Sequence, residues 1–256
     1  MDASEATQKS GTEVDTQNKK IYNQNKEKSM EVSGEVNGTV YILGTEMHPL
    51  QELLEIIRRH GIVCVIDVRN YTETLAQKVQ RIELKEFFYS NQIHYRDYSE
   101  SLSMDTQERK YLTSNGFMDF TKYRSSLGYS TAISKLKEGV RRGYNCCVIG
   151  YRRGLGDCHR SILVGHGLLM EGVDAMHITS NIGVLPQSEL EKMLVEQAFP
   201  TIEQMTLFDM PQQPFEDKLE TVLKDKNKEL GKRWLAERSY FNAREEQKPK
   251  PPRWFW

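Results

Sequence analysis

The sequence predicts an α/β domain of three layers, in which a mostly parallel sheet is covered by helices on both faces. Short apolar runs rich in β-branched residues occur at Val40–Leu43, Ile62–Val68 and Cys146–Tyr151. Stretches with helical spacing of apolar residues separate them, and a glycine follows several of these stretches. Strands that alternate with helices favour a parallel sheet, and continuous apolar runs are typical of strands buried on both faces.

The first half of the domain contains two complete strand–helix units. Residues 50–60 carry apolar side chains at helical spacing, and Gly61 stands where a helix often ends. We expect a strand at 40–43, a helix at 50–60, a strand at 62–68, a helix at 75–91 and a strand at 93–98.

The second half repeats this alternation after a polar, irregular stretch at 101–114. In residues 129–142, apolar side chains form one stripe, and Gly143 follows it. We expect helices at 117–126 and 129–142, a strand at 146–151, a helix at 158–171 ended by Gly172, and a last strand at 175–179.

The two ends of the chain differ in composition from this domain, which we place at residues 39–185. Residues 1–38 are almost entirely polar and predict a disordered tail. Residues 186–256 form an extension with a short helix at 189–197, a loop at 200–214 and a highly charged helix at 215–246. The sequence therefore predicts one domain with a tail and a helical extension.

Composition excludes some functions. The formal net charge of the 256 residues is −1, which argues against a globally basic nucleic-acid coat. No apolar run approaches the length of a membrane span, and no apolar signal core follows Met1. The four cysteines are too few for a disulfide framework in a chain of this length. We expect a cytoplasmic protein with reduced thiols and no membrane partner.

Polar and charged residues follow the predicted strands, at the edge where parallel sheets bind ligands. Gly44 and Thr45 follow the first strand, Asp67 and Arg69 end the second, and Arg152 follows the strand at 146–151. Several arginines at one edge predict a site for an anion such as a phosphate. Alternatively, each arginine is solvated or paired with a nearby aspartate.

The run Cys158-His159-Arg160-Ser161 opens the helix after that last loop. A cysteine in a first helical turn tends toward the thiolate, and a cation at that place suggests an anionic ligand. In the alternative interpretation Asp157 caps the helix and Cys158 packs inward. The spacing of Cys158 and His159 relative to other histidines does not fit a metal site, so we expect neither a metal nor a cofactor.

These motifs resemble the DUF488 family over about 140 residues. The resemblance rests on Val40-Tyr-Ile-Leu-Gly44, Val65-Ile-Asp-Val-Arg69, Ile93-His-Tyr95, the stretch from Phe117 to Gly143, Cys158-His-Arg-Ser161 and Met176-His-Ile178. It implies an α/β fold and a site but no reaction, because the name of the family records an unknown function.

This chain departs from the family pattern at two places, which makes it a divergent member. Family members usually have Gly-His-Ser after the first strand, where this chain has Gly44-Thr45-Glu46. They usually have Cys-x-Glu before Cys-His-Arg, where Gly150 and Arg152 stand here. Either Glu46 or Asp67 substitutes for the missing acid or base, or the protein only binds.

Outside the domain, Gln204-Met-Thr-Leu207-Phe208 resembles the peptide that bacterial DNA-repair and replication proteins insert into the sliding clamp. Leu207 and Phe208 would enter an apolar pocket while Gln204 bonds at its rim. In the alternative interpretation, these side chains anchor the tail on the domain.

Two hypotheses of function follow, and whether the protein is an enzyme stays open. In the first, the strand-end site takes a phosphorylated small molecule or a nucleic acid, with a nucleotide or a nucleic-acid-derived substrate in DNA metabolism as the expected ligand. Asp67, Cys158 and His159 would be catalytic, and Gly44, Thr45, Arg69, Arg152, Arg160 and Ser161 would bind the anion. In the second, the protein is a non-catalytic adaptor that acts through its tails, including the clamp-like peptide.

Overall fold

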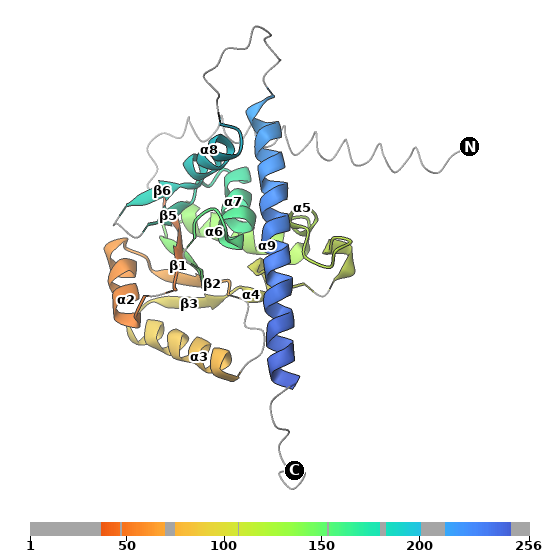
Figure 1. The fold of residues 1–256 in the computed structure, drawn as a ribbon. Coiled ribbons are helices and arrows are strands. Elements are labelled where there is room, and N and C mark those ends of the chain that lie inside the picture. The colour runs from red at the N-terminus through yellow and green to blue at the C-terminus, as the bar shows by residue number, and fades with distance from the viewer. Residues whose placement is uncertain are drawn as a thin grey trace, which may run out of the picture.

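The computed structural model describes residues 37–46, 48–69, 75–106, 108–152, 154–179, 183–200 and 213–246 (Figure 1). The predicted tail at 1–38 lies outside these residues except for its last two. The sheet contains β1 (Val40–Gly44), β2 (Cys64–Asp67), β3 (His94–Asp97), β4 (Cys146–Gly150), β5 (Met176–Ile178) and β6 (Val184–Pro186).

These strands lie in the order β3-β2-β4-β1-β5-β6, and only the pairing of β5 with β6 is antiparallel among the described strands. The predicted, mostly parallel sheet is therefore confirmed. β6 was not expected from the sequence, because a run of three residues ending in Pro186 carries no strand pattern of its own.

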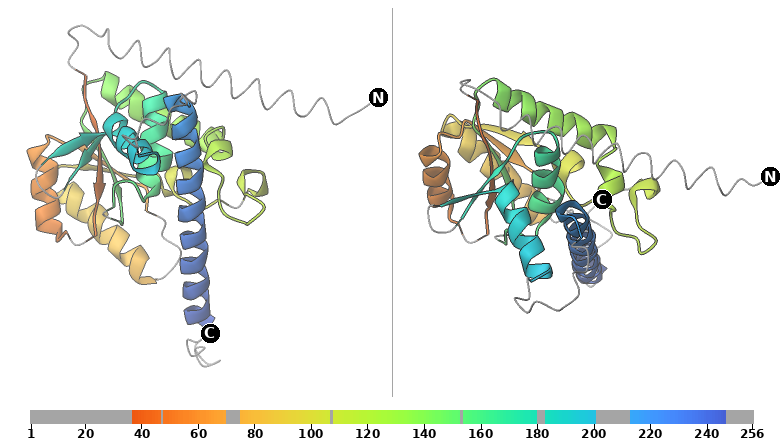
Figure 2. Two further views of the ribbon diagram at one scale, coloured as in Figure 1. Left: turned by 45° about the horizontal axis from the view of Figure 1, so that its top comes forward. Right: turned by 90° about the horizontal axis from the view of Figure 1, so that it is seen from above.

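Helices cover both faces of the sheet, which confirms the three layers (Figure 2). Leu43 packs in one core with α2 (Leu50–Arg59) and α3 (Leu75–Ser90), whereas Ile42 packs in the other. That second core contains residues of α6 (Leu127–Arg141), α7 (His166–Met170) and α8 (Gln187–Ala198). Neighbouring residues of a strand point to opposite faces, so both layers draw on the same strands.

Glycines end helices as their positions predict. Gly61 after α2 and Gly143 after α6 have φ angles of 60° and 82°. Only residues without a Cβ take up these values easily, so each glycine lets the chain turn directly from a helix into the following strand.

The expected helix at 117–126 is wrong in its length, since α5 is confined to Phe120–Tyr123. Asn227, distant in sequence, accepts a hydrogen bond from the backbone N–H of Phe120 and donates one to the carbonyl of Met118. These contacts hold the backbone before α5 in a non-helical form. The expected irregular stretch at 101–114 contains the end of α4 (Ser99–Leu102) and a short 3₁₀ turn, η1 (Arg109–Tyr111).

The expected helix at 158–171 has two parts. A π-helical segment, η2 (Arg160–Gly165), leads directly into α7. Gly165 and Gly167 lie so close to the side chains of Gln187 and Tyr129 that a Cβ at either glycine would collide with them. The wider π turn and the two glycines allow this segment to pack deeply against its neighbours.

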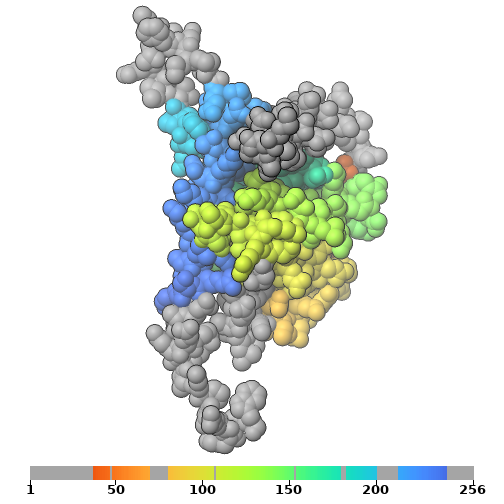
Figure 3. All heavy atoms as spheres, turned by 90° about the vertical axis from the view of Figure 1, so that its right-hand side faces the viewer, coloured from red at the N-terminus to blue at the C-terminus, as the bar shows by residue number. Residues whose placement is uncertain are grey.

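The predicted charged helix is α9 (Phe215–Glu246), which lies along the side of the domain (Figure 1). Leu219, Val222, Leu223 and Leu230 of α9 are buried in the core that contains α6 to α8. In Figure 3 the blue spheres of α9 lie beside the yellow-green segment that contains α5, the segment that Asn227 contacts. The first half of α9 thus contributes to the core, while the boundary at residue 185 stays a prediction.

Helices long and apolar enough to cross a membrane do not occur in the described ranges.

Candidate functional site

The order of the strands defines where a ligand site is expected. β1 and β4 are neighbours, but β1 is followed by α2 on one face, and β4 is followed by η2 and α7 on the other. In open α/β sheets, the chain leaves a crevice at the carboxyl ends of two such strands. The chain segments that follow β1, β2 and β4 meet at this edge.

A cleft of about 680 Å³ lies at this edge and extends to the second half of α9. One wall comes from the strand ends and the start of η2, and the other comes from α9. Its lining residues are Glu46, Arg69, Gln80, Met104, Tyr151, Arg152, Cys158, His159, Arg160, Leu230, Arg233, Trp234, Ala236, Glu237, Arg238 and Tyr240.

Asp67 lies behind this lining and holds Arg69 in place. Its fully buried carboxylate accepts hydrogen bonds from the backbone N–H, Nε and Nη2 of Arg69, the last at 2.7 Å. The hydroxyl of Tyr95 donates a further bond of 2.6 Å to Oδ2 of Asp67. The carboxylate is thus engaged on several sides and fixes one guanidinium at the cleft.

Arg160 is the most deeply buried arginine of the cleft, with 2% of its surface exposed. Its Nη2 donates to the carbonyl of Arg152, but its Nε has no hydrogen-bond partner. No carboxylate in the described part of the chain forms an ion pair with it. Gly150 makes room for this side chain, because a Cβ there would collide with the guanidinium. Gly150, which stands where family members usually have the cysteine of Cys-x-Glu, thus leaves the space that the buried Arg160 side chain occupies.

Cys158 lines the cleft, and Ser161 faces it from behind the lining. Cys158 is 2% exposed, and its Sγ lies 3.3 Å from Oγ of Ser161. The Ser161 hydroxyl in turn donates to the carbonyl of Leu155. These contacts shape the loop before η2 and leave the thiol little access to solvent.

His159 is partly exposed at the cleft and is held by the backbone of β2. Its Nε2 lies 3.2 Å from the carbonyl oxygen of Val68, so Nε2 carries the proton and donates. Desolvation, followed by the charge of Arg160, lowers the pKa of His159 to about 3. The imidazole is therefore neutral at neutral pH and is a weak base.

α9 closes the second wall through polar contacts with the strand-end side. Arg152 forms an ion pair with Glu237, and Arg233 donates to the carbonyl of Asp157. The guanidinium of Arg238 lies 5.0 Å from the centre of the Trp234 ring. Five arginines and two glutamates line the whole cleft, so the lining carries a net charge of +3.

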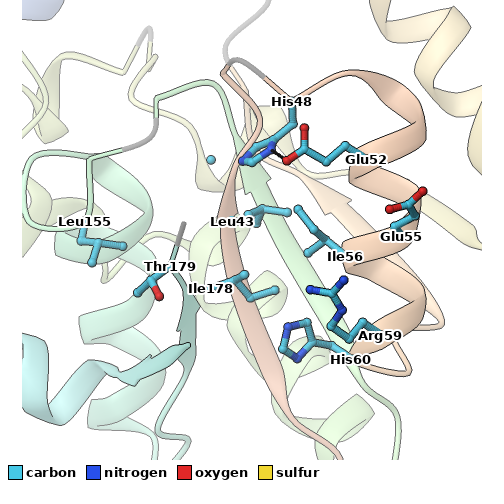
Figure 4. A pocket seen from close by; sticks show the side chains of 11 residues that line it. Leu43, His48, Glu52, Glu55, Ile56, Arg59, His60, Leu155, Ile178 and Thr179 are labelled. Atoms are coloured by element: carbon cyan, nitrogen blue, oxygen red, sulfur yellow. Dashed lines mark hydrogen bonds and ion pairs between the residues drawn. The ribbon is translucent and has the colours of Figure 1, made fainter. Parts of the chain in front are cut away.

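Two predicted anion-binding residues lie elsewhere. Thr45 bonds with its backbone N–H and its hydroxyl to the carbonyl of Gly150, which ties the ends of β1 and β4 together. Gly44 lines a separate cavity of about 350 Å³. Figure 4 shows this cavity, in which His48 and Glu52 form a pair at 3.1 Å. Neither Gly44 nor Thr45 lines the arginine-rich cleft.

The structure brings Arg69, Arg152, Cys158, His159 and Arg160 together and places Asp67 and Ser161 directly behind them. Gln204, Leu207 and Phe208 lie outside the described residues. The wall from α9, which was not expected from the sequence, contributes Arg233, Trp234, Glu237, Arg238 and Tyr240. A tryptophan and an arginine four residues apart in an otherwise charged helix were the available signal.

Among the described side chains, no three of His, Cys, Asp or Glu form a group that could hold a metal ion. Residues 49–166 match the family model DUF488, described as a domain of unknown function. No curated protein and no solved structure matches the chain.

Proposed function

We propose that this chain, whose residues 49–166 form a DUF488 domain, binds a phosphorylated ligand in the cleft between the strand ends and α9. The observation that carries the proposal is the buried guanidinium of Arg160, which has an unpartnered Nε and forms no ion pair with a described carboxylate. Burial of a charge is costly unless an opposite charge or hydrogen bonds compensate it. A phosphate in the cleft would supply the opposite charge.

The surroundings of Arg160 favour the same ligand. Arg69 is held by Asp67 before any ligand arrives, so little conformational entropy is lost when it binds. Guanidinium groups form paired hydrogen bonds with phosphate oxygens, and the net charge of the lining is positive. The ligand classes that fit are a phosphorylated small molecule and a nucleic-acid-derived phosphate, as the sequence predicts.

The contacts of Asp67, Cys158 and His159 support a role in ligand binding more directly than a role in catalysis. The carboxylate of Asp67 is engaged with Arg69 and Tyr95, and the thiol of Cys158 is buried. His159 is neutral and weakly basic. Catalytic roles for these three residues stay predictions, and we propose that they support the anion site.

Isothermal titration of the full chain with inorganic phosphate and ribose 5-phosphate tests the proposal. Arg233→Ala should weaken binding of both about twofold to fivefold, because it removes one positive charge from the lining of the cleft. Arg142→Ala is the matched control, since Arg142 is 62% exposed and ion-paired to Glu138 outside the cleft. Failure of both ligands to bind, or equal effects of the two variants, would overturn the proposal.

The adaptor hypothesis has one observation in its favour. The clamp-like peptide at 204–208 lies between α8 and α9, and both helices are anchored in the core by residues such as Leu194 and Leu219. The peptide is therefore tethered to a folded body at both ends. We also propose, as a separate function, that it binds the sliding clamp.

A further inference from the structure

We infer that the ligand of this cleft is a nucleoside phosphate, whose base lies against the aromatic side chains of the cleft while its phosphate lies at Arg160. This inference rests on the proposed phosphate site and names its ligand class. The lining of the cleft contains both arginines and aromatic side chains. A nucleotide carries a phosphate that the arginines would bind and a base that the aromatic rings would contact.

Three aromatic side chains line the cleft from opposite walls. Tyr151 follows β4 and is 59% exposed, whereas Tyr240 on α9 is 60% exposed. Trp234, also on α9, is partly exposed. Exposed aromatic rings gathered in one concave surface are unfavourable in water, and such surfaces usually mark a binding site. A planar ligand group would cover them.

Trp234 and Arg238 lie against each other in this wall. The Arg238 guanidinium lies 5.0 Å from the centre of the indole ring and 3.4 Å from a carboxylate oxygen of Asp105. Indole rings and guanidinium planes are the protein groups on which nucleobases commonly stack. The two side chains thus offer planar groups to a base, and contacts with Trp234 and Asp105 hold Arg238 in position.

The size of the cleft agrees with this ligand. A volume of about 680 Å³ lies within the usual range for small-molecule sites. A phosphate ion alone would fill only the space of a few water molecules, at about 30 Å³ each. The rest of the cleft, next to Tyr151 and Trp234, is left for the nucleoside.

Titration of the full chain with ribose 5-phosphate, adenosine 5′-monophosphate and a short single-stranded oligonucleotide tests the inference. The mononucleotide should bind at least about fivefold more tightly than ribose 5-phosphate, because one stacked base contributes that much or more. Stacking tolerates every base, so cytidine 5′-monophosphate should show a similar gain. Tighter binding of the oligonucleotide would identify a strand as the source of the nucleotide, and weaker binding would identify a free nucleotide.

Variants of exposed tyrosines separate stacking from folding. Tyr151→Ala and Tyr240→Ala should each reduce the gain of the mononucleotide over ribose 5-phosphate, whereas Tyr151→Phe should keep it. Tyr144→Ala is the control, because Tyr144 is 52% exposed and does not line the cleft. If ribose 5-phosphate binds as tightly as the mononucleotide, the inference is wrong and the phosphate site stands. If neither ligand binds, the proposed function itself fails.

Discussion

Individual charges set the electrostatics of the cleft. Arg160 and Arg69 are buried cations, and Arg152 forms an ion pair with Glu237. The sequence predicts a role for Arg160 in binding an anion, because an arginine at the start of a helix is unusual without an anion. The burial of Arg160 was not predictable, since it depends on the space at Gly150 and on contacts with residues 150–152.

Removal of Glu237 should strengthen anion binding. Glu237→Gln keeps the shape of the side chain but abolishes its charge, which frees Arg152 and raises the net charge of the lining. We expect phosphate to bind about twofold to fivefold more tightly, in line with the modest energy of exposed ion pairs. Titration with phosphate measures this directly. Weaker or unchanged binding would contradict a role of Arg152 in the site.

Buried neutral histidines should make the fold sensitive to acid. Burial lowers the pKa of His177 from 6.5 to about 4, and its Nε2 donates to Oε1 of Gln187. The unfolded chain therefore takes up a proton first as the pH falls, so stability is complete above pH 6.5 and is lost toward pH 4.

For His177 alone, the loss between pH 7.5 and pH 5 should be about 2 kcal/mol. Urea unfolding at both pH values measures the total, to which His159 and His166 add in the same direction. His177→Gln removes one titrating group and should shrink the difference between the two pH values. An unchanged difference would show that His177 is protonated equally in both states.

At the scale of elements, one glycine lets α9 pack closely against the segment before α5. Gly231 lies so close to the Phe117 side chain that a Cβ there would overlap the ring. Gly231→Ala should therefore lower the free energy of unfolding by about 1–3 kcal/mol through overpacking and weaken phosphate binding, because the second half of α9 carries one wall of the cleft.

Gly139→Ala in α6 is the matched control for that substitution. The nearest atom to its added Cβ is Sγ of Cys146 at 3.7 Å, an ordinary contact. This variant should raise stability by up to about 1 kcal/mol, because alanine favours helices over glycine. Thermal unfolding of both variants decides the point. A rise in stability for Gly231→Ala as well would mean that α9 does not pack as described.

The strands and long helices were predictable because their signals are local. β2 and β4 are apolar runs, and α2 and α6 carry apolar stripes ended by glycine. The exceptions arise from contacts between distant residues. Asn227 limits α5 through hydrogen bonds that no local pattern contains, and β6 forms because the chain returns beside β5.

For the molecule as a whole, the site consists of two parts that lie far apart in the sequence. The strand ends and residues 158–161 were predictable, because parallel strands end at one edge. The wall from α9 was not predictable, because its position depends on buried leucines, on Asn227 and on Gly231. In the sequence, Gly231 is only a residue of low helix propensity within a charged helix. Composition alone suggested a separate extension.

The clamp-like peptide makes a further prediction for the whole chain. Binding to the sliding clamp should have a micromolar dissociation constant, typical of a few anchor side chains. It should vanish in the double variant Leu207→Ala, Phe208→Ala. Titration with the clamp and thermal unfolding of the variant are measured together. Lack of binding, or a lower melting temperature of the variant, would instead support an intramolecular anchor.

The most direct test of the anion site is the side-chain NMR spectrum of the protein labelled with ¹⁵N-arginine. The Nε–H signal of Arg160 is assigned by its loss in Arg160→Lys and followed while phosphate is added. We predict that this signal shifts and reaches saturation at the phosphate concentration that saturates binding by calorimetry, because Nε belongs to the guanidinium whose charge the phosphate compensates. Saturation of binding without any change in the Arg160 signal would contradict the account.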